Sequence, residues 1–402
     1  MKRSFWQAGH TPTLFCAFLY FDLSFMVWYL LGPMQVQIAQ DLQLDTQQRA
    51  FMVATPILCG AVLRLFMGTL SDRIGAKRAG VLAQITVIAA LLAAWQIGVH
   101  SFAQVLLLGF FLGVAGASFS IALPLASRWY PPEHQGTALG IAGAGNSGTV
   151  FAALFAPMLA LAFGWRNVLA LAALPLIIVL IAFVVFAKEA PARVQRKGLR
   201  DYTQVLVANR DSWWFMLFYS ITFGGFSGFA SALPGYFHDQ FAFDPKAAGW
   251  ATAACVFAGS AMRPVGGVIA DRIGGTRALL AVYLMTAALV AGVASGIGGS
   301  FATVALFVLT MLCLGAGNGA VFQLVPQRFG SEIGLMTGLI GMAGGIGGFL
   351  LAAGLGIVKQ HTGSYSPGLW LFAAVSGLAW LSLSGIKQHW REQLSIGNAA
   401  RV

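Results

Sequence analysis

Charged residues are scarce in this chain. Only 9% of the 402 residues are Asp, Glu, Lys or Arg, whereas a soluble chain contains about 25%. Hydrophobic residues make up 58%. So few charges cannot cover the surface of a soluble protein of this length, and most of the exterior must face something other than water. The composition therefore excludes the ordinary soluble classes and predicts a polytopic membrane protein.

Cysteine is scarce too, and its pattern excludes two kinds of site. None of the four cysteines lies in a Cys-x-x-Cys motif or beside a histidine, and each lies in an apolar stretch. We therefore expect neither a disulfide framework nor a metal site. No cofactor is expected. The apolar runs contain no Ser/His/Asp, Cys/His or paired-carboxylate set, so an enzyme is not expected either. The cysteines are Cys16, Cys59, Cys255 and Cys313.

Long apolar runs are abundant. A spanning helix needs about 20 apolar residues, and twelve such runs are separated by charges, glycine and proline. The first run is long enough to span and follows a short basic stretch, so no cleavable signal peptide is expected. The runs lie near 12–33, 50–70, 79–98, 104–126, 136–160, 167–187, 213–235, 248–270, 278–298, 302–326, 333–357 and 369–387.

One long polar segment, Lys188 to Asp211, separates the sixth run from the seventh. The sequence therefore predicts an all-α membrane protein with 12 transmembrane helices, six on each side of this segment. We expect an N-terminal bundle at 1–187, a cytoplasmic linker at 188–212 and a C-terminal bundle with a short cytoplasmic tail at 213–402.

Basic residues exceed acidic ones by 24 to 13, a net charge of +11. In a soluble protein this excess would suggest a nucleic-acid partner. With twelve spans both termini share one side, and placing that side in the cytoplasm puts 18 basic residues inside and 4 outside. The positive-inside rule then predicts cytoplasmic termini in a cytoplasmic (inner) membrane, and no nucleic acid is needed to explain the charge. The four outside are Arg49, Arg166, Lys246 and Lys359.

The two halves of the sequence repeat one another. The stretch from Arg64 to Gly75 aligns without a gap with Arg263 to Gly274 at an offset of 199, matching in Arg, Gly, Asp, Arg, Ile and Gly. A second pairing sets Gly113–Pro124 against Gly315–Pro326. Duplicated halves are common in transporters, whose substrate site lies between the repeats.

Three charged residues fall inside the spans. Arg64 lies eight residues, or ~12 Å along a helix, from Asp72, and Arg263 has the same place in the second half. Arginines at that depth are functional candidates. Without matching acids, two guanidiniums suit a small planar anion, although each could instead reach toward the surface or bind helix carbonyls. Asp22 is predicted either to exchange protons or to be a static counter-ion of an arginine.

Two glycine-rich segments match a nucleotide-binding pattern formally. They begin at Gly143 and Gly315. Neither follows a strand or opens a βαβ unit, and both are predicted to lie within apolar helices, so the Rossmann interpretation fails. Tight helix packing explains the glycines better, with Asn146 as a polar group directed at the cavity.

The loops from Gly68 to Lys77 and from Gly267 to Arg277 resemble the hallmark of the major facilitator superfamily. The resemblance implies two pseudo-symmetric six-helix bundles that rock about a central site. An Asp-Arg pair at a cytoplasmic helix end can lock one conformation and so act as a gate. An aspartate there could also be a plain helix-terminal charge. The gating candidates are Asp72, Arg73, Asp271 and Arg272.

At the glycine segments the resemblance narrows to the nitrate/nitrite porter family. The signature glycines are Gly143, Gly145 and Gly148 in the fifth span and Gly341, Gly344, Gly345 and Gly348 in the eleventh. The resemblance implies that substrate is bound by Arg64, Arg263, Asn146, Phe119, Tyr219 and Phe223. Such a set is chemically sensible, because aromatic faces can sandwich a flat, weakly hydrated anion while guanidiniums bind its edge.

The first span, from Phe21 to Trp28, is similar to the proton-coupled uptake branch of that family, and Asp22 carries this similarity. The sequence thus predicts a secondary transporter in the lipid bilayer, a monomer that imports nitrate or nitrite with protons by alternating access. Nitrate/nitrite antiport remains an alternative, as does an anion-sensing membrane receptor built on a transporter fold.

Overall fold

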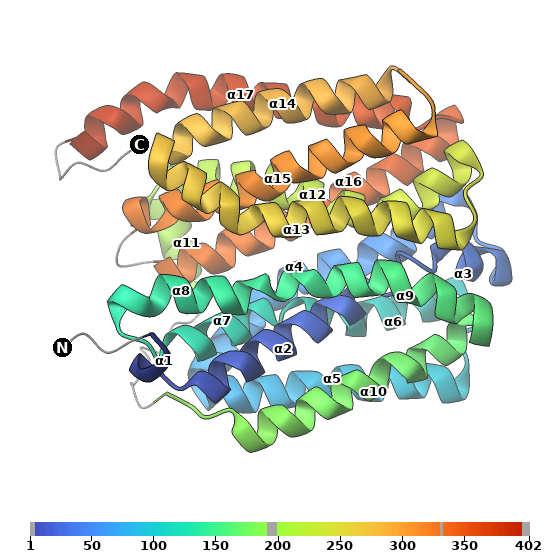
Figure 1. The fold of residues 1–402 in the computed structure, drawn as a ribbon, viewed down its shortest axis with the longest axis horizontal. Helices are drawn as coiled ribbons and strands as arrows, with labels where there is room; N and C mark the ends of the chain where they lie inside the picture. Colours follow the sequence, from blue (N-terminus) through green and yellow to red (C-terminus); the bar gives the residue numbers. More distant parts are fainter. Residues whose placement is uncertain (1–4, 191–198, 330–332, 396–402) are drawn as a thin grey trace.

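Twelve helices long and apolar enough to cross a membrane form most of the computed structural model, which describes residues 5–190, 199–329 and 333–395 (Figure 1). The predicted all-α fold with twelve spans is confirmed, and the described residues contain no strand. Ten spans are single helices: α2 (Thr11–Trp28), α4 (Thr46–Ile74), α5 (Ala76–Ile97), α10 (Trp165–Phe186), α12 (Asp211–Phe241), α13 (Pro245–Ile273), α14 (Gly275–Ala294), α15 (Ser300–Phe329), α16 (Ile333–Thr362) and α17 (Ser366–Ser395).

The other two spans are interrupted, which the sequence analysis did not predict. The fourth consists of α6 (Phe102–Gly116) and α7 (Phe119–Ser127). The fifth runs through α8 (Pro132–Gly143), the 3₁₀ turn η1 (Ala144–Ser147) and α9 (Gly148–Phe163). Both breaks fall in glycine-rich sequence, where the side chains that would favour a continuous helix are missing.

Three short helices lie outside the spans: α1 (Phe5–Ala8), α3 (Gln35–Asp41) and α11 (Leu199–Ala208). The first span ends at Trp28, earlier than predicted, because a turn carries the chain into α3. Several basic residues counted for the topology lie outside the described residues, so the structure does not place them. They are Lys2, Arg3, Arg193, Arg196, Lys197 and Arg401.

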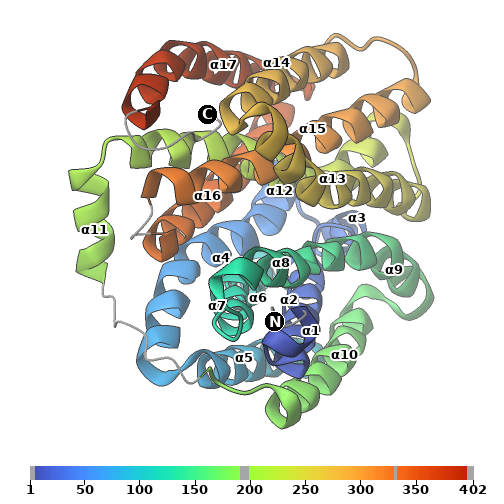
Figure 2. The same ribbon diagram turned by 60° about the vertical axis from the view of Figure 1, so that its left-hand side comes forward.

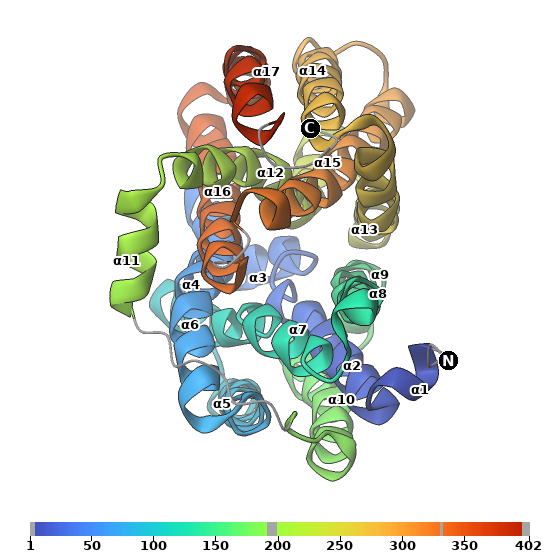
Figure 3. The ribbon, with the colours of Figure 1, turned by 90° about the vertical axis from the view of Figure 1, so that its left-hand side faces the viewer.

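The helices form two halves that lie one above the other when viewed along the bundle (Figure 3). α4 of the first half packs against α16 of the second, and α9 packs against α13. Figure 1 shows α1 and α11 at the same end of the bundle, with α3 at the other. We call these the α11 end and the α3 end. Figure 2 shows α11 at the side of the bundle, next to both halves. Its Tyr202 side chain lies close to Gly68 of the first half and Gly338 of the second, within 3.4 Å of a Cβ added at either glycine.

The repeat in the sequence becomes the same helix crossing in both halves. A Cβ added to Gly113 of α6 would collide with Cys59 of α4, and one added to Gly315 of α15 would collide with the Gly259 carbonyl of α13. Glycine at these positions lets the backbones approach closely. The pseudo-symmetric architecture thus rests on matched small residues.

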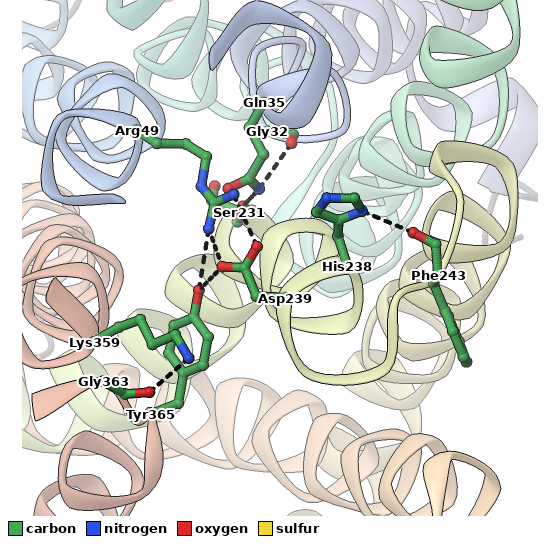
Figure 4. A network of polar contacts seen from close by, with 10 residues as sticks. All are labelled: Gly32, Gln35, Arg49, Ser231, His238, Asp239, Phe243, Lys359, Gly363 and Tyr365. Carbon is green, nitrogen blue, oxygen red and sulfur yellow. Dashed lines mark hydrogen bonds and ion pairs between the residues drawn. The ribbon is translucent and has the colours of Figure 1, made fainter. Parts of the chain in front are cut away.

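The two halves are joined by polar contacts at the α3 end (Figure 4). Arg49 of α4 forms an ion pair with Asp239 of α12, and both side chains are mostly buried. The Tyr365 hydroxyl donates to Asp239 Oδ2 at 2.6 Å and accepts from Arg49 Nη2 at 3.2 Å. Burial raises the pKa of Tyr365, so its phenol keeps the proton that it donates. Gln35 adds a second bridge, from its Nε2 to the Ser231 carbonyl oxygen at 2.8 Å.

At the α11 end the recorded ion pairs lie within a half. Arg128 Nη2 donates to Asp72 Oδ1 at 2.9 Å in the first half, and Arg328 pairs with Asp211 in the second. Among the described residues, therefore, only the α3 end has an ion pair across the interface. The conformation is one in which polar contacts hold the α3 end closed.

We expect Arg49→Ala to shift the protein away from this conformation. The substitution leaves the Asp239 charge mostly buried without its ionic partner, at a cost on the order of 2 kcal/mol, which is a roughly thirtyfold change in a conformational equilibrium. Gln40 and Gln240 are exposed, one in each half near the α3 end. Spin labels at these positions, in a background without native cysteines, should report longer distances in the variant.

Arg166→Ala is the matched control, because Arg166 pairs with Asp41 within the first half. It should leave the label distances unchanged. The charge exchange Arg49→Asp with Asp239→Arg should restore the short distances. Wild-type distances in Arg49→Ala would contradict a role for this ion pair in joining the halves.

Candidate functional site

Arg64 lies midway along α4 and is only 3% exposed. Its Nε donates to the Gly116 carbonyl oxygen at 3.2 Å and its Nη1 to the Gly341 carbonyl oxygen at 2.7 Å. Gly116 is the last residue of α6. In a continuous helix the Ser120 N–H would donate to the Gly116 carbonyl oxygen, but here it donates to the Ala117 carbonyl oxygen, so the Gly116 carbonyl is free to accept from the arginine. Gly341 belongs to α16. The guanidinium therefore bonds to both halves of the protein.

Aromatic faces cover the rest of Arg64. Its Cζ lies 5.2 Å from the ring centre of Trp28, 5.7 Å from that of Phe119 and 5.2 Å from that of Phe223. A ring face attracts a cation at this range. The buried Nη2 has no hydrogen-bond partner among the described residues. A buried donor without a hydrogen-bond partner costs free energy, so an acceptor on a ligand would gain most binding free energy at this nitrogen.

Arg263 of α13 lies at the other side of the same cluster and is more exposed than Arg64. Its Nη2 donates to the Tyr219 hydroxyl at 3.4 Å, and its Cζ lies 5.5 Å from the ring centre of Phe322. Tyr219 stacks on Phe223 with ring centres 5.2 Å apart and an interplanar angle of 4°. Phe223 in turn faces Arg64, so these two rings bridge the arginines.

A second aromatic bridge closes the cluster. Phe322 meets Tyr219 edge-on at 5.1 Å and lies 6.4 Å from Phe119, which faces Arg64. We call this cluster the arginine cage. The structure brings together five residues that the sequence assigned to the substrate, and it adds Phe322, which the sequence analysis did not. The cage consists of Arg64, Phe119, Tyr219, Phe223, Arg263 and Phe322.

Trp28 is a further residue that the sequence analysis did not single out. Its indole N–H donates to the Pro56 carbonyl oxygen at 2.7 Å. The ring is wedged so tightly that a Cβ added to Gly60 or Gly116 would strike it. Trp28 is thus a fixed platform under the Arg64 guanidinium. In the sequence, Gly60 and Gly116 are the signal for this role of Trp28. Their meaning becomes clear only when it is known which helices pack against one another.

The glycines of the eleventh span explain how α16 reaches the cage. A Cβ at Gly344 would strike Tyr219 and Phe223, and one at Gly345 would strike Ala61 of α4. At Gly348 it would collide with Ser227 of α12. These positions let α16 lie directly against α4 and α12, and they bring the Gly341 carbonyl to Arg64.

The glycines of the fifth span differ from one another. Gly145 and Gly148 let η1 and the start of α9 lie directly on the backbone of α2. A Cβ at Gly145 would collide with Phe21, and one at Gly148 would collide with the Asp22 carbonyl. Gly143 has no atom within 4 Å of an added Cβ, so close packing does not explain it. Asn146 is 3% exposed, and its side-chain oxygen has no partner among the described residues. No recorded contact joins Asn146 to either arginine.

Asp22 is buried, but its partner is not the one expected. Its Oδ1 accepts a hydrogen bond from the Ser147 hydroxyl at 2.7 Å. Among the described residues no ion pair joins Asp22 to Arg64 or Arg263. In this conformation, therefore, Asp22 is not a direct counter-ion of either arginine. Ser147, which lies within the glycine signature, was not among the residues expected from the sequence.

The four gating candidates do not form the expected Asp-Arg pairs. Asp72 is bonded to Arg128, whereas Arg73, Asp271 and Arg272 are exposed and have no recorded ion pair. The ends of α4 and α13 therefore form no recorded ion pair across the interface in this conformation. Their gating role stays a prediction.

The cage is suited to a small planar anion. It offers two guanidiniums, of which Arg64 is held by neutral carbonyls and rings, and no carboxylate ion-pairs with either arginine among the described residues. Guanidinium forks match planar oxyanions, and ring faces can cover the flat sides of such an ion.

Comparisons with known proteins agree on the fold. Residues 15–352 match the family model of the Major Facilitator Superfamily. The chain is 33% identical to the nitrite extrusion protein of Bacillus subtilis, covering 92% of each chain. It is 32% identical to the probable nitrate/nitrite transporter NarK2 of Mycobacterium tuberculosis, covering 89% of this chain and 91% of the relative. The probable nitrate transporter NarT of Staphylococcus epidermidis is also 32% identical, with coverage of 88% and 90%.

Among solved structures, a bacterial homologue of the human lysosomal transporter Spinster, described as inward-facing and unoccupied, aligns with a TM-score of 0.70. The alignment covers 100% of both chains at 15% sequence identity. At this identity the likeness concerns the fold alone.

The fifth-span glycines give a matched pair of substitutions. We expect Gly148→Ala to lower the melting temperature and the folded yield in detergent, because the added methyl collides with the Asp22 carbonyl. Gly143→Ala should be neutral or stabilising by roughly 0.5–1 kcal/mol, since it adds helix propensity in open space. Fluorescence-detected size-exclusion chromatography after heating measures both. Equal melting temperatures would refute the close packing of η1 on α2.

Proposed function

The chain belongs to the major facilitator superfamily, in the family of nitrate/nitrite porters, and from this premise we propose that it transports nitrate or nitrite across the cytoplasmic membrane, importing the anion together with protons. The observation that carries the proposal is the arginine cage. Nitrate is flat and singly charged, so ring faces cover it while Arg64 Nη2 and Arg263 bind its edge. The names of the relatives support the same substrate.

The proposed orientation puts the α11 end in the cytoplasm. The described basic residues concentrate at this end, near the ends of α4, α7, α10, α13, α15 and α17 and in α11. The α3 end, held closed by Arg49 and Asp239, then faces outward, and the described conformation is the inward-facing one of an alternating-access cycle. In this proposal residues 1–187 and 213–402 are the two bundles, 188–212 the linker, and a monomer is sufficient for transport.

Asp22 is the proposed proton carrier. It is 4% exposed, it lies in a spanning helix, and its hydrogen-bond partners are neutral groups, the Ser147 hydroxyl and the backbone of Gly148. A buried carboxyl without an ionic partner can change its protonation when its surroundings change. Because Asp22 does not pair with the cage arginines, its protonation acts on them through the packing of the first half and not as a direct counter-ion.

Nitrate/nitrite exchange is the second candidate. The observation that favours it is the relative named for nitrite extrusion, which is 33% identical over 92% of this chain. An exchanger would use the same cage, because nitrite is also a small planar oxyanion. Asp22 separates the candidates, since exchange of one anion for the other needs no proton.

Replacing either cage arginine by lysine should sharply reduce nitrate transport. An ammonium cannot reproduce the planar fork, and the loss of charge-assisted hydrogen bonds of about 1.5–3 kcal/mol corresponds to a roughly ten- to hundredfold weaker affinity. Nitrate uptake into proteoliposomes and nitrate-induced quenching of tryptophan fluorescence measure Arg64→Lys and Arg263→Lys. Arg78→Lys, at an exposed arginine, is the control. Near-normal transport by both cage variants would refute the paired-arginine site.

Nitrate uptake with and without an inward proton gradient tests the coupling. We expect the gradient to drive accumulation in the wild type and to have little effect in Asp22→Asn, which cannot ionise. The exchange of labelled nitrate across the membrane should persist in that variant. Gradient-independent uptake that requires internal nitrite and is unchanged in Asp22→Asn would establish exchange instead of symport.

A further inference from the structure

The hydroxyl of Ser147 has one hydrogen and two acceptors within reach. Its Oγ lies 2.7 Å from Asp22 Oδ1 and 2.9 Å from the carbonyl oxygen of Ala144, three residues earlier in η1. A serine hydroxyl donates one hydrogen bond and can accept others. Only one of the two contacts can be donated by Ser147 at a time, and the protonation of Asp22 decides which.

We propose that Ser147 is the positioning residue that transmits the protonation of Asp22 to the turn η1; this rests on the proposed proton symport. When Asp22 is ionised, Ser147 donates its hydrogen to Oδ1. When Asp22 takes up one proton, its own O–H donates to Ser147 Oγ, and the serine hydrogen turns to the Ala144 carbonyl. The Ser147 hydroxyl keeps its proton throughout, and loss of the Asp22 proton reverses the sequence.

The packing makes η1 sensitive to this reversal. Gly145 and Gly148 flank Ser147 and lie so close to α2 that neither tolerates a Cβ. The turn cannot shift away from the carboxyl without disturbing these contacts. In the protonated state the serine hydrogen gives the Ala144 carbonyl oxygen a second donor, and side-chain bonding of this kind bends a helical segment, so the geometry of η1 differs between the two states.

The same turn reaches the other half of the protein. η1 packs against α13, the helix that carries Arg263, and α9 continues this contact where Gly249 meets the Ala153 carbonyl. Asn146, next to Ser147, is buried with an unpartnered side-chain oxygen. A change in the η1 hydrogen bonds therefore alters the contact between the halves and the position of Asn146, which belongs to the proposed substrate-binding set.

Among the described residues, the charges on the helices that pack against α2 lie at helix ends. α2 packs against α6, α7, α8, α9, η1 and α10. Of these, α6, α7, α9 and η1 carry no charged residue, α8 has Glu133 and His134 in its first turn, and α10 has Arg166 at its start. These positions are at helix ends, whereas Asp22 lies midway along α2. Arg64 on α4 is bonded to carbonyls and not to Asp22.

The test compares coupled accumulation with exchange in proteoliposomes. In Ser147→Ala we expect exchange of labelled nitrate within about twofold of the wild type, because the cage is intact. Accumulation driven by a proton gradient, and the nitrate-dependent acidification reported by internal pyranine, should fall roughly fivefold or more, toward the level of Asp22→Asn. Ser147→Thr keeps a hydroxyl at the same place and should restore coupling.

Ser295→Ala is the matched control, because that hydroxyl also donates to a carbonyl three residues earlier but has no recorded bond to a carboxylate. Proton-driven accumulation in the double variant Asp22→Asn with Ser147→Ala should be no lower than in Asp22→Asn alone, because the two substitutions interrupt the same pathway. If Ser147→Ala folds poorly, Ser147→Cys, whose thiol is a weak donor, replaces it.

Each outcome supports or overturns the inference. Wild-type accumulation in Ser147→Ala, or in Ser147→Cys, together with its loss in Asp22→Asn, would overturn the role of Ser147 and leave proton symport intact. Loss of exchange and accumulation alike in both Ser147 variants, with no rescue in Ser147→Thr, would also overturn it, because the residue would then serve the fold or the cage. Absence of proton-driven nitrate uptake in the wild type would instead refute the proposed function.

Discussion

A guanidinium in the middle of a membrane-spanning bundle needs compensation, since burying an unpaired charge there costs several kcal/mol. Around Arg64 the compensation comes from neutral groups: two carbonyl oxygens and three ring faces. The break after Gly116 frees one carbonyl, and the glycines of α16 bring the Gly341 carbonyl close. Had an aspartate supplied the compensation, the charge of Arg64 would be neutralised and the attraction of the site for an anion would be weaker. The irregular helix and the glycine tracts are thus two consequences of one electrostatic requirement.

The two halves repeat the fold but not the environment of the arginine. The position equivalent to Trp28 at the offset of 199 is Ser227, which packs against Gly348 and provides no ring. Arg263 therefore has Phe322 and a long hydrogen bond to Tyr219, both from its own half, and it is more exposed. Arg64 is the fixed member of the pair. Arg263 is the member that can adjust, so an arriving anion can order it.

Composition and run length were sufficient to predict the twelve spans, and the repeat at offset 199 predicted the matched halves, because both depend on the local sequence and on the thickness of a bilayer. The partner of Asp22 could not be predicted in this way. Charge alone suggested an arginine, whereas two glycine contacts that exist only after packing bring Ser147 to the carboxyl. The interruptions of the fourth and fifth spans were missed for the same reason, since glycine tracts look alike whether they line a helix contact or end a helix.

In the proposed alternating-access cycle, Arg64 and Arg49 link anion binding to conformational change. Both lie on α4, and both bond to the second half, Arg49 through Asp239 at the α3 end and Arg64 through Gly341 at the centre. Opening the α3 end moves α4 relative to α12 and α16, so both bonds must be exchanged for others. Arg49 can exchange its partner for water at the surface. Arg64 cannot, because it is buried, and an anion in the cage is the partner that can replace a lost carbonyl. A ligand can drive a conformational cycle only by binding one state better than another, and in the proposed cycle this exchange of partners is the source of the difference in affinity.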